Sequence, residues 1–295
     1  MGDLEPQAFR GLERSCESWT GDGIVTAPPF PGIERMEARF YGDAFDLHRH
    51  DTYAIGVTLQ GVQSFHYRGA LRHSLPGNLI VLHPDELHDG GAGTEDGLRY
   101  RILYLEPSLL LRALEDEHVP LPFVGQPVLT DEGLKASLLS VLGPLDQGLD
   151  DLAVDDLVSR IAQGLAAHAG QRLKPLGSLA WRQVHLACDY LEAHATRSVR
   201  SQELEKITGL DRYALSRHFR ALLATSPHRF LLMRRLQHAR SMIEAGEPLA
   251  EIAVATGFAD QSHLNRHFKK AFGLTPGRWA GLVTAGAGAA APKLL

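Results

Sequence analysis

The chain has 295 residues and a net charge of −5, and its 44% hydrophobic and 22% charged residues are typical of globular proteins with room for two cores. Its N-terminus, MGDLEPQ, lacks a basic segment followed by an apolar run, and nothing approaches the roughly 18 apolar residues that span a bilayer. We therefore expect a cytoplasmic protein without membrane contact. Cys16 and Cys188 lack metal-like spacing and are interpreted as reduced thiols.

The N-terminal third changes from an irregular tract to short strands. Residues 1–30 are polar and end in Ala-Pro-Pro-Phe-Pro, which predicts an extension without regular structure. From Ile33 to Leu105, short apolar stretches with β-branched or aromatic residues alternate with turns that contain Gly61, Gly69 and Gly77. Closely spaced short strands of this kind predict a small β-barrel or jelly roll. The stretches are 53–60, 64–68, 72–75, 78–83 and 99–105.

These strands contain residues that resemble the two motifs of the cupin fold. Gly42, His48 and His50 match the first motif, and Gly77, Pro84 and His88 match the second with one residue fewer before the histidine. The resemblance implies a barrel in which three histidines and a glutamate hold one metal ion, but Ala54 occupies the glutamate position. His48, His50 and His88 are therefore candidate ligands for a divalent ion such as zinc, candidate groups of an effector pocket, or ordinary core residues. Because His48 and His50 alternate around Arg49, we expect them on one face of a strand.

Residues 107–172 favour helix. We therefore expect residues 31–172 to form a cupin-like sensor and dimerisation domain, in which helices follow the barrel. Leu157, Ile161 and Leu165 form one apolar stripe, which fits either internal core or a surface for a partner subunit. Residues 173–177 are interpreted as a linker, with Ser178 as the N-cap of the next helix.

The segment from Leu249 to Trp279 has the pattern of a helix-turn-helix followed by a third helix. Gly257 separates two helical patterns, and the second places Leu264, Phe268 and Ala271 on one face. Gly273 is a helix stop, and Thr275-Pro276 starts another helix. The low-complexity residues 282–295 are expected to be a flexible tail.

The same pattern occurs 48 to 49 residues earlier. Thr208-Gly209 matches Thr256-Gly257, and Ser226-Pro227 matches Thr275-Pro276. Residues 178–281 therefore contain two helix-turn-helix units. Residues 178–280 also hold 15 Lys and Arg against 9 Asp and Glu, a net of +6, whereas the rest of the chain has a net of −11. A basic half with two such units fits a duplex-binding domain.

These residues resemble the AraC/XylS family of bacterial transcription regulators. The resemblance implies that the helix from Pro227 to Glu244, with Phe230, Met233, Leu236 and Ile243 buried, separates the two units. It also assigns phosphate contacts to Lys269 and Lys270. The base contacts that it assigns are Arg212, Tyr213, Ser216, Arg217, Gln261, Ser262, His263, Asn265 and Arg266. RNA polymerase and a second copy of the chain are further partners that the resemblance implies.

The chain is thus expected to be a two-domain α+β protein, with an N-terminal cupin-like jelly roll and a C-terminal all-α domain. The favoured function is that of a promoter-binding transcription regulator controlled by a small-molecule effector in the cupin-like domain. The alternatives are a regulator without an effector and a metal-dependent cupin enzyme fused to a DNA-binding module. The absence of the motif glutamate and of a nucleophile-and-base pair argues against an enzyme.

Overall fold

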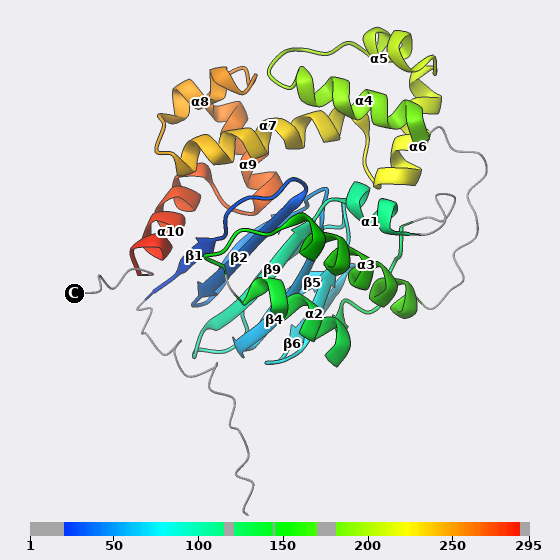
Figure 1. The fold of residues 1–295 in the computed structure, drawn as a ribbon. Coiled ribbons are helices and arrows are strands. Elements are labelled where there is room, and N and C mark those ends of the chain that lie inside the picture. Colours follow the sequence, from blue (N-terminus) through cyan, green and yellow to red (C-terminus); the bar gives the residue numbers. More distant parts are fainter. Residues whose placement is uncertain (1–20, 115–120, 144, 170–180, 290–295) are drawn as a thin grey trace, which may run out of the picture.

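A computed structural model describes residues 21–114, 121–143, 145–169 and 181–289, and Figure 1 shows its arrangement. The predicted linker, Ser178 and Cys16 lie outside the described residues. The strands are β1 Gly23–Thr26, β2 Ile33–Phe40, β3 Asp43–His48, β4 Tyr53–Gly61, β5 Gln63–Tyr67, β6 Ala70–Ser74, β7 Leu79–Leu82, β8 His88–Ala92, β9 Leu98–Leu105 and β10 Val128–Leu129. The helices are α1 Pro107–Ala113, α2 Glu132–Leu142, α3 Asp151–His168, α4 Trp181–Ala193, α5 Ser201–Thr208, α6 Arg212–Leu223, α7 Pro227–Glu244, α8 Leu249–Ala255, α9 Gln261–Phe272 and α10 Pro276–Ala289. No helix in these described ranges is long and apolar enough to cross a bilayer.

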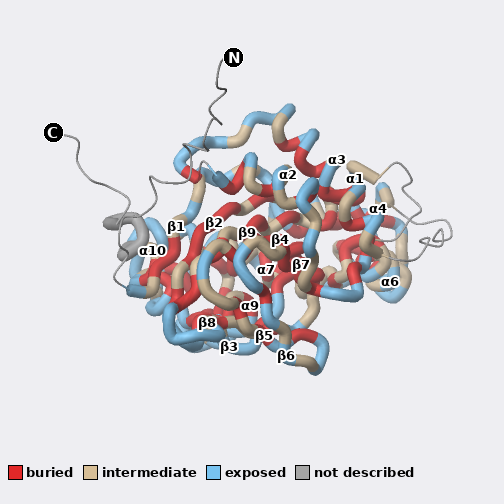
Figure 2. Tube along the Cα trace, turned by 90° about the horizontal axis from the view of Figure 1, so that it is seen from below, coloured by how far each residue is buried: buried red, intermediate tan, exposed pale blue. Residues whose placement is uncertain are grey.

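The N-terminal domain is the predicted jelly roll, built from two antiparallel sheets. One has the strand order β1-β2-β9-β4-β7-β10 and the other β3-β8-β5-β6. Alternation along β4 explains why the stretch from Tyr53 to Val57 is apolar throughout. Ala54 belongs to the core between the sheets, whereas Tyr53, Ile55 and Val57 belong to a second core that includes α2 and α3. Figure 2 shows that residues along β4 and its neighbouring strands are buried.

The apolar stripe on α3 lies inside the domain. Leu157, Ile161 and Leu165 are fully or almost fully buried, in the same cluster as Leu134 and Leu138 of α2. The interpretation of this stripe as a partner surface is therefore wrong, since α3 uses it to cover the six-stranded sheet (Figure 1).

Regular structure extends further toward both ends of the chain than predicted. β1 lies within the supposed irregular extension, pairs with β2 and buries Ile24 completely. At the other end, α10 continues to Ala289 within the supposed flexible tail, and Leu282 is buried. The two corrections are connected, because α10 packs along β1 and covers the edge strand of the sheet (Figure 1).

The C-terminal domain contains the two predicted helix-turn-helix units at opposite ends of α7 (Figure 1). α4, α5 and α6 lie at one end, and α8, α9 and α10 lie at the other. The predicted core faces of α6, α7 and α9 are buried, including Phe219, Leu236 and Phe268. Helical geometry makes the 18-residue α7 about 27 Å long, which sets the scale of the separation between the units.

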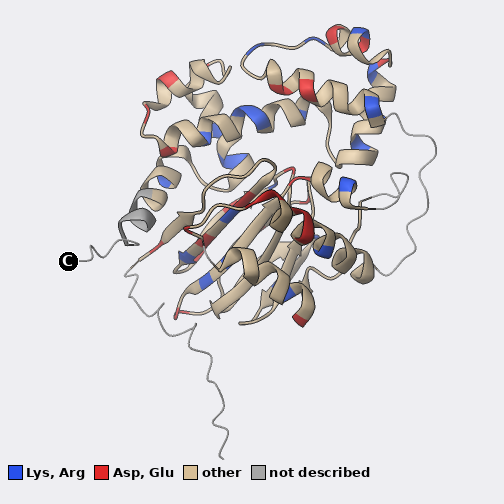
Figure 3. Ribbon diagram, viewed as in Figure 1, with Lys and Arg blue, Asp and Glu red and all other residues tan. Residues whose placement is uncertain are grey.

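α7 also docks the C-terminal domain onto the barrel through ion pairs. Arg229 lies 2.8 Å from Asp85, Arg234 lies 3.1 Å from Asp51, and Arg240 lies 2.5 Å from Glu34. Figure 3 shows basic residues along α7 and acidic residues on the barrel beneath it. The barrel core is continuous with the apolar core of the second unit. The two domains are therefore packed against each other through both charged and apolar contacts.

Candidate nucleic-acid interface and metal centre

The first candidate reading helix, α6, is positioned by its N-cap. Asp211 accepts hydrogen bonds from the backbone N–H groups of Tyr213 and Ala214 at 2.9 and 3.0 Å. With the apolar face of α6 buried, the polar face points outward: Tyr213 is 71% exposed and Arg217 is also exposed. Ser216 lies half-buried beside them.

Arg212 differs from these neighbours because it is held within its own domain. Its Nε donates to Glu205 at 3.0 Å, and its backbone N–H donates to the same oxygen. The pair is half exposed, so it is a weak restraint that a phosphate or base can displace.

The second candidate reading helix, α9, has the same construction. Asp260 accepts from the backbone N–H of His263 at 2.7 Å, and Gln261, Ser262 and Arg266 are exposed. The exposed Lys270 lies one turn beyond Arg266. These residues form an open face that a duplex can approach.

Three predicted contact residues of α9 have other environments. His263 is half-buried and packs edge-on against the ring of Phe258, with 5.5 Å between centroids. Asn265 is half-buried and has a fully buried side-chain oxygen. Lys269 lies 2.7 Å from Asp46 of β3, and both side chains are exposed, so this ion pair with the docked barrel is a weak restraint. The sequence pattern contained no signal for the Lys269–Asp46 contact, because both residues look like ordinary surface charges.

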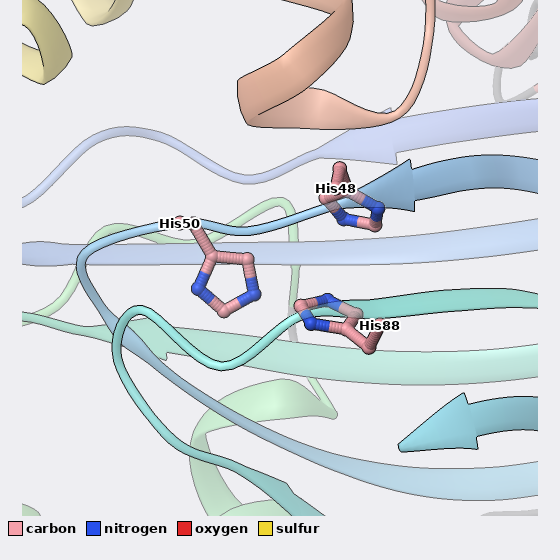
Figure 4. A group of neighbouring side chains, drawn as sticks. All are labelled: His48, His50 and His88. Atoms are coloured by element: carbon pink, nitrogen blue, oxygen red, sulfur yellow. The ribbon is translucent and has the colours of Figure 1, made fainter. Parts of the chain in front are cut away.

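The three motif histidines meet at the end of the barrel nearest α9. Their ring centroids lie 4.3 Å apart for His48 and His88, 4.8 Å for His50 and His88, and 6.0 Å for His48 and His50 (Figure 4). All three residues are buried. The structure corrects one detail, since β3 ends at His48 and His50 lies in the following loop. The rings meet because this loop turns back across the barrel (Figure 4).

Each imidazole is held by a backbone carbonyl two residues away. His48 Nδ1 lies 2.8 Å from the Asp46 carbonyl, His50 Nδ1 lies 2.9 Å from that of Thr52, and His88 Nδ1 lies 2.9 Å from that of Glu86. Because a carbonyl can only accept, each Nδ1 is the donor and each Nε2 presents a lone pair. Such outer-shell carbonyls orient the histidines of metal sites.

The cluster is also electrostatically prepared for a cation. Burial and the neighbouring histidine lower the pKa of His48 to about 3, and burial lowers the pKa of His88 to about 4. Burial lowers the pKa of His50 well below its ordinary value. All three rings are therefore neutral near pH 7, and the buried Nε2 of His50 has no hydrogen-bond partner within the described residues.

The distances between the histidines fit an ion after a small adjustment. One ring nitrogen from each can be selected so that all three lie within 4.8 Å of one another. Ligand nitrogens around a tetrahedral zinc ion are separated by roughly 3.4 Å, so the most distant pair of ring nitrogens would have to close by about 1.4 Å. Within the described part of the chain, no other cluster of three or more His, Cys, Asp or Glu side chains is close enough together to hold a metal ion.

The position of the missing glutamate faces a tyrosine. Ala54 is fully buried, and its partner across the β4–β9 ladder is Tyr104. The Tyr104 ring lies edge-on to His50, with 5.3 Å between centroids. Sequence analysis missed Tyr104, although its alternation with Tyr100 and Ile102 along β9 places it on the inner face. Burial raises its pKa, so the phenol is neutral.

The space beside the histidines is small. The cavity lined by His48, His50, Tyr104 and Phe272 has a volume of about 30 Å³. This volume accommodates an ion or a water molecule, and it is far below the several hundred Å³ of organic-ligand pockets. The larger cleft between β2 and α7 has a volume of about 540 Å³ and is lined by Phe30, Arg240 and Trp279, among others.

Two domain families match the chain. Residues 30–162 match the AraC-like ligand binding domain, and residues 204–281 match a helix-turn-helix domain. An uncharacterized HTH-type transcriptional regulator of Bacillus subtilis strain 168, YbfI, is 28% identical over 79% of this chain and 87% of its own length. A probable thc operon regulatory protein of Rhodococcus erythropolis is 34% identical over 32% of this chain and 29% of its own length.

The fold has counterparts among solved structures. ToxT from Vibrio cholerae superposes with a TM-score of 0.63 over 86% of this chain and 99% of that protein, at 13% identity. This likeness shows that the barrel, the trailing helices and the two helix-turn-helix units form a known two-domain fold. The matched domains and their order agree with the geometry above. The chain belongs to the AraC family of transcriptional regulators, with an AraC-like ligand binding domain followed by a helix-turn-helix domain.

Proposed function

We propose that the protein reads promoter DNA with the exposed faces of α6 and α9, at two segments whose separation α7 determines. The supporting observation is the duplicated arrangement, in which each helix buries its apolar face, starts at an aspartate cap and exposes an arginine. Tyr213, Ser216 and Arg217 read one segment, and Gln261, Ser262 and Arg266 read the other. Arg212 joins the first set of base contacts once the duplex displaces Glu205, and Lys270 contacts a phosphate.

Substitutions of the two arginines and of Lys270 test this assignment. Arg217→Ala and Arg266→Ala should each lose roughly 1 to 3 kcal/mol of discrimination between specific and random duplex. Lys270→Ala should weaken both by a similar factor and reduce the salt slope by about 1. Anisotropy titrations at several salt concentrations measure both quantities. Identical losses on specific and random DNA for all three variants would contradict the assignment.

We further propose that the sensor domain responds to a divalent metal ion bound by His48, His50 and His88. The neutral imidazoles, each with Nδ1 held by a carbonyl, favour an ion at this place. The adjoining cavity, which His48 and His50 line and His88 does not, is too small for an organic molecule. Bound there, the ion would act as the effector and supply charge, with Ala54 leaving a ligand position open. The barrel thus acts as a sensor and not as an enzyme, which agrees with the relatives that are named as regulators.

Elemental analysis of untagged protein tests the metal proposal. The wild type should retain about one zinc or other divalent ion per chain, and the double variant His48→Ala/His88→Ala should retain none while staying folded. His66→Ala is a matched control, because His66 is an exposed histidine paired with Asp89 outside the cluster. In a reporter assay the double variant should lose its response to the metal. Equal metal content in wild type and double variant would refute the site.

An organic effector is a second candidate, with the cleft between β2 and α7 as its site. Its volume of about 540 Å³ lies within the range of organic-ligand pockets. A ToxT structure with a bound unsaturated fatty acid belongs to a protein of similar fold, which supports an effector of this size. Ser241→Trp would fill the cleft and should abolish the response to such an effector while leaving the metal content unchanged.

Two protein partners complete the proposal. Contact with RNA polymerase is supported by family membership. For a homodimer, the outer side of the four-stranded sheet offers Leu47 of β3 and Leu71 of β6, and Leu87 lies just before β8; each is between 43% and 55% exposed. Sedimentation equilibrium of wild type and Leu71→Glu tests this face: the variant should shift toward monomer, and an unchanged mass would exclude the face.

A further inference from the structure

A third cavity lies between the sensor domain and the first helix-turn-helix unit, and it shares Asp51 with the small cavity beside the histidines. It has a volume of about 190 Å³. α1 forms one wall, and α4 and the start of α7 form the others. Its apolar walls include Pro107, Trp181, Val184, Leu223 and Phe230. These residues surround a space large enough for a small organic molecule and below the usual range for drug-sized ligands.

The polar side of this cavity has more negative than positive charge. Asp51 lies 3.1 Å from Arg234, Glu192 lies 3.9 Å from it, and Glu106 accepts a hydrogen bond from it. Three carboxylates thus share one guanidinium, whose side chain is only 12% exposed. Arg112 and Asp189 also line the cavity and contribute one charge of each sign, and His185 lies 3.9 Å from Asp189. The excess of carboxylates therefore remains.

Three polar atoms that belong to lining residues have no partner within the described residues. They are the Oδ1 of Asp51, the Oγ1 of Thr225 and the Nε of Arg234, and all three are buried. Asp51 and Thr225 are only 4% and 3% exposed as whole residues. Buried polar groups are nearly always hydrogen-bonded, so Asp51, Thr225 and Arg234 bring unused hydrogen-bonding capacity to the wall of this cavity, as suits a site for a polar group of a ligand.

We propose that this cavity binds a small organic cation, namely a primary amine with an aromatic or branched apolar body. The ammonium group donates to the free oxygens of Asp51 and Thr225 and offsets the excess of carboxylates, while the apolar body lies against Trp181, Val184 and Phe230. An anionic ligand would be repelled by the excess of carboxylates.

The site is built by both domains. Asp51 and Glu106 belong to the sensor, and Thr225 and Phe230 belong to the DNA-binding domain. An amine bound here contacts both, so it stabilises the docked arrangement over the separated one. The inference uses none of the proposed metal ligands and none of the DNA-contacting residues, and Asp51 connects the two sites because it follows His50 and also lines the small cavity beside the histidines.

Calorimetry and thermal unfolding of the full-length protein with 2-phenylethylamine test the proposal. The amine should bind saturably and raise the Tm, whereas 2-phenylethanol should bind more weakly and phenylacetate should not bind. Thr225→Val keeps the shape and removes the free hydroxyl, and it should weaken binding of the amine about tenfold. Cys188→Trp should fill the cavity and abolish binding.

Ser241→Val is the matched control, because Ser241 lines the other interdomain cleft. It should leave binding of the amine unchanged. Circular dichroism verifies that each variant is folded. No saturable binding of the amine would mean a cavity filled only by water and would overturn the proposal. Equal binding of amine and phenylacetate, or an unchanged affinity in Thr225→Val, would overturn it as well.

Discussion

Gly273 offers the sharpest perturbation of the contact between the two domains. It ends α9 with φ of 71°, and a Cβ there would lie 2.8 Å from His48 Nδ1, 2.9 Å from the Asp46 carbonyl oxygen and 2.9 Å from Phe45 Cβ. Its backbone carbonyl accepts from the Asp46 N–H at 3.0 Å. Gly209 ends α5 with φ of 72°, and a Cβ there would meet nothing within 4 Å. The two positions share a backbone conformation and differ in what faces them.

The comparison separates backbone strain from loss of docking. Gly209→Ala should cost about 1 kcal/mol, because alanine is disfavoured in the left-handed region. Gly273→Ala has the same cost and an added roughly 1 to 3 kcal/mol, since a methyl group would overlap backbone and ring atoms of β3. The added loss is limited by the free energy of docking, because the domains can separate instead of accepting the overlap.

Urea unfolding of the two full-length variants measures these costs, and small-angle scattering measures the separation. We expect a larger loss of unfolding free energy for Gly273→Ala, together with an increased radius of gyration. Gly209→Ala should keep the wild-type radius. Equal losses and equal radii for the two variants would refute the docking of α9 against β3.

Two further predictions concern stability. Burial lowers the pKa of His83 to about 4, from about 6.5 in an unfolded chain. The stability that the neutral, buried His83 contributes to the folded state is therefore fully present above about pH 6.5 and is lost as the pH falls toward 4. The loss of unfolding free energy is on the order of 3 kcal/mol. Urea titrations at several pH values should show that the unfolding free energy of His83→Gln depends less steeply on pH than that of the wild type, and an identical dependence would contradict this assignment. Asp211→Ala and Asp260→Ala each remove an N-cap and should cost about 1 kcal/mol, whereas the Asn variants should cost only a few tenths; equal costs for Ala and Asn would show that the caps contribute little.

The local structure of the C-terminal domain could be predicted because each signal is short-range. The apolar spacing of Leu264, Phe268 and Ala271, the stop at Gly273 and the Thr275-Pro276 start define α9 and α10 within a few residues. Thr275 accepts from the Arg278 N–H at 3.3 Å, as an N-cap does. The meeting of His48, His50 and His88 followed from the cupin motif, and their distances agree with it.

The missed features depend on contacts between distant segments. β1 has only four residues beside a proline-rich tract, and it forms because β2 and α10 flank it. α10 extends to Ala289 because alanine favours helix, although the segment reads as low complexity. Arg234 has the appearance of a surface residue of an amphipathic helix, and its burial depends on carboxylates far away in the chain.

The central claim is that two helices of one chain read two segments of DNA. Selection of binding sites from a random duplex library tests this claim most directly. The wild type should select two preferred segments whose centres lie about one helical turn, roughly 34 Å, apart. Arg217→Ala should flatten the base preference in one segment, and Arg266→Ala should flatten it in the other. Selection of a single segment, or loss of preference at the same bases in both variants, would contradict the claim.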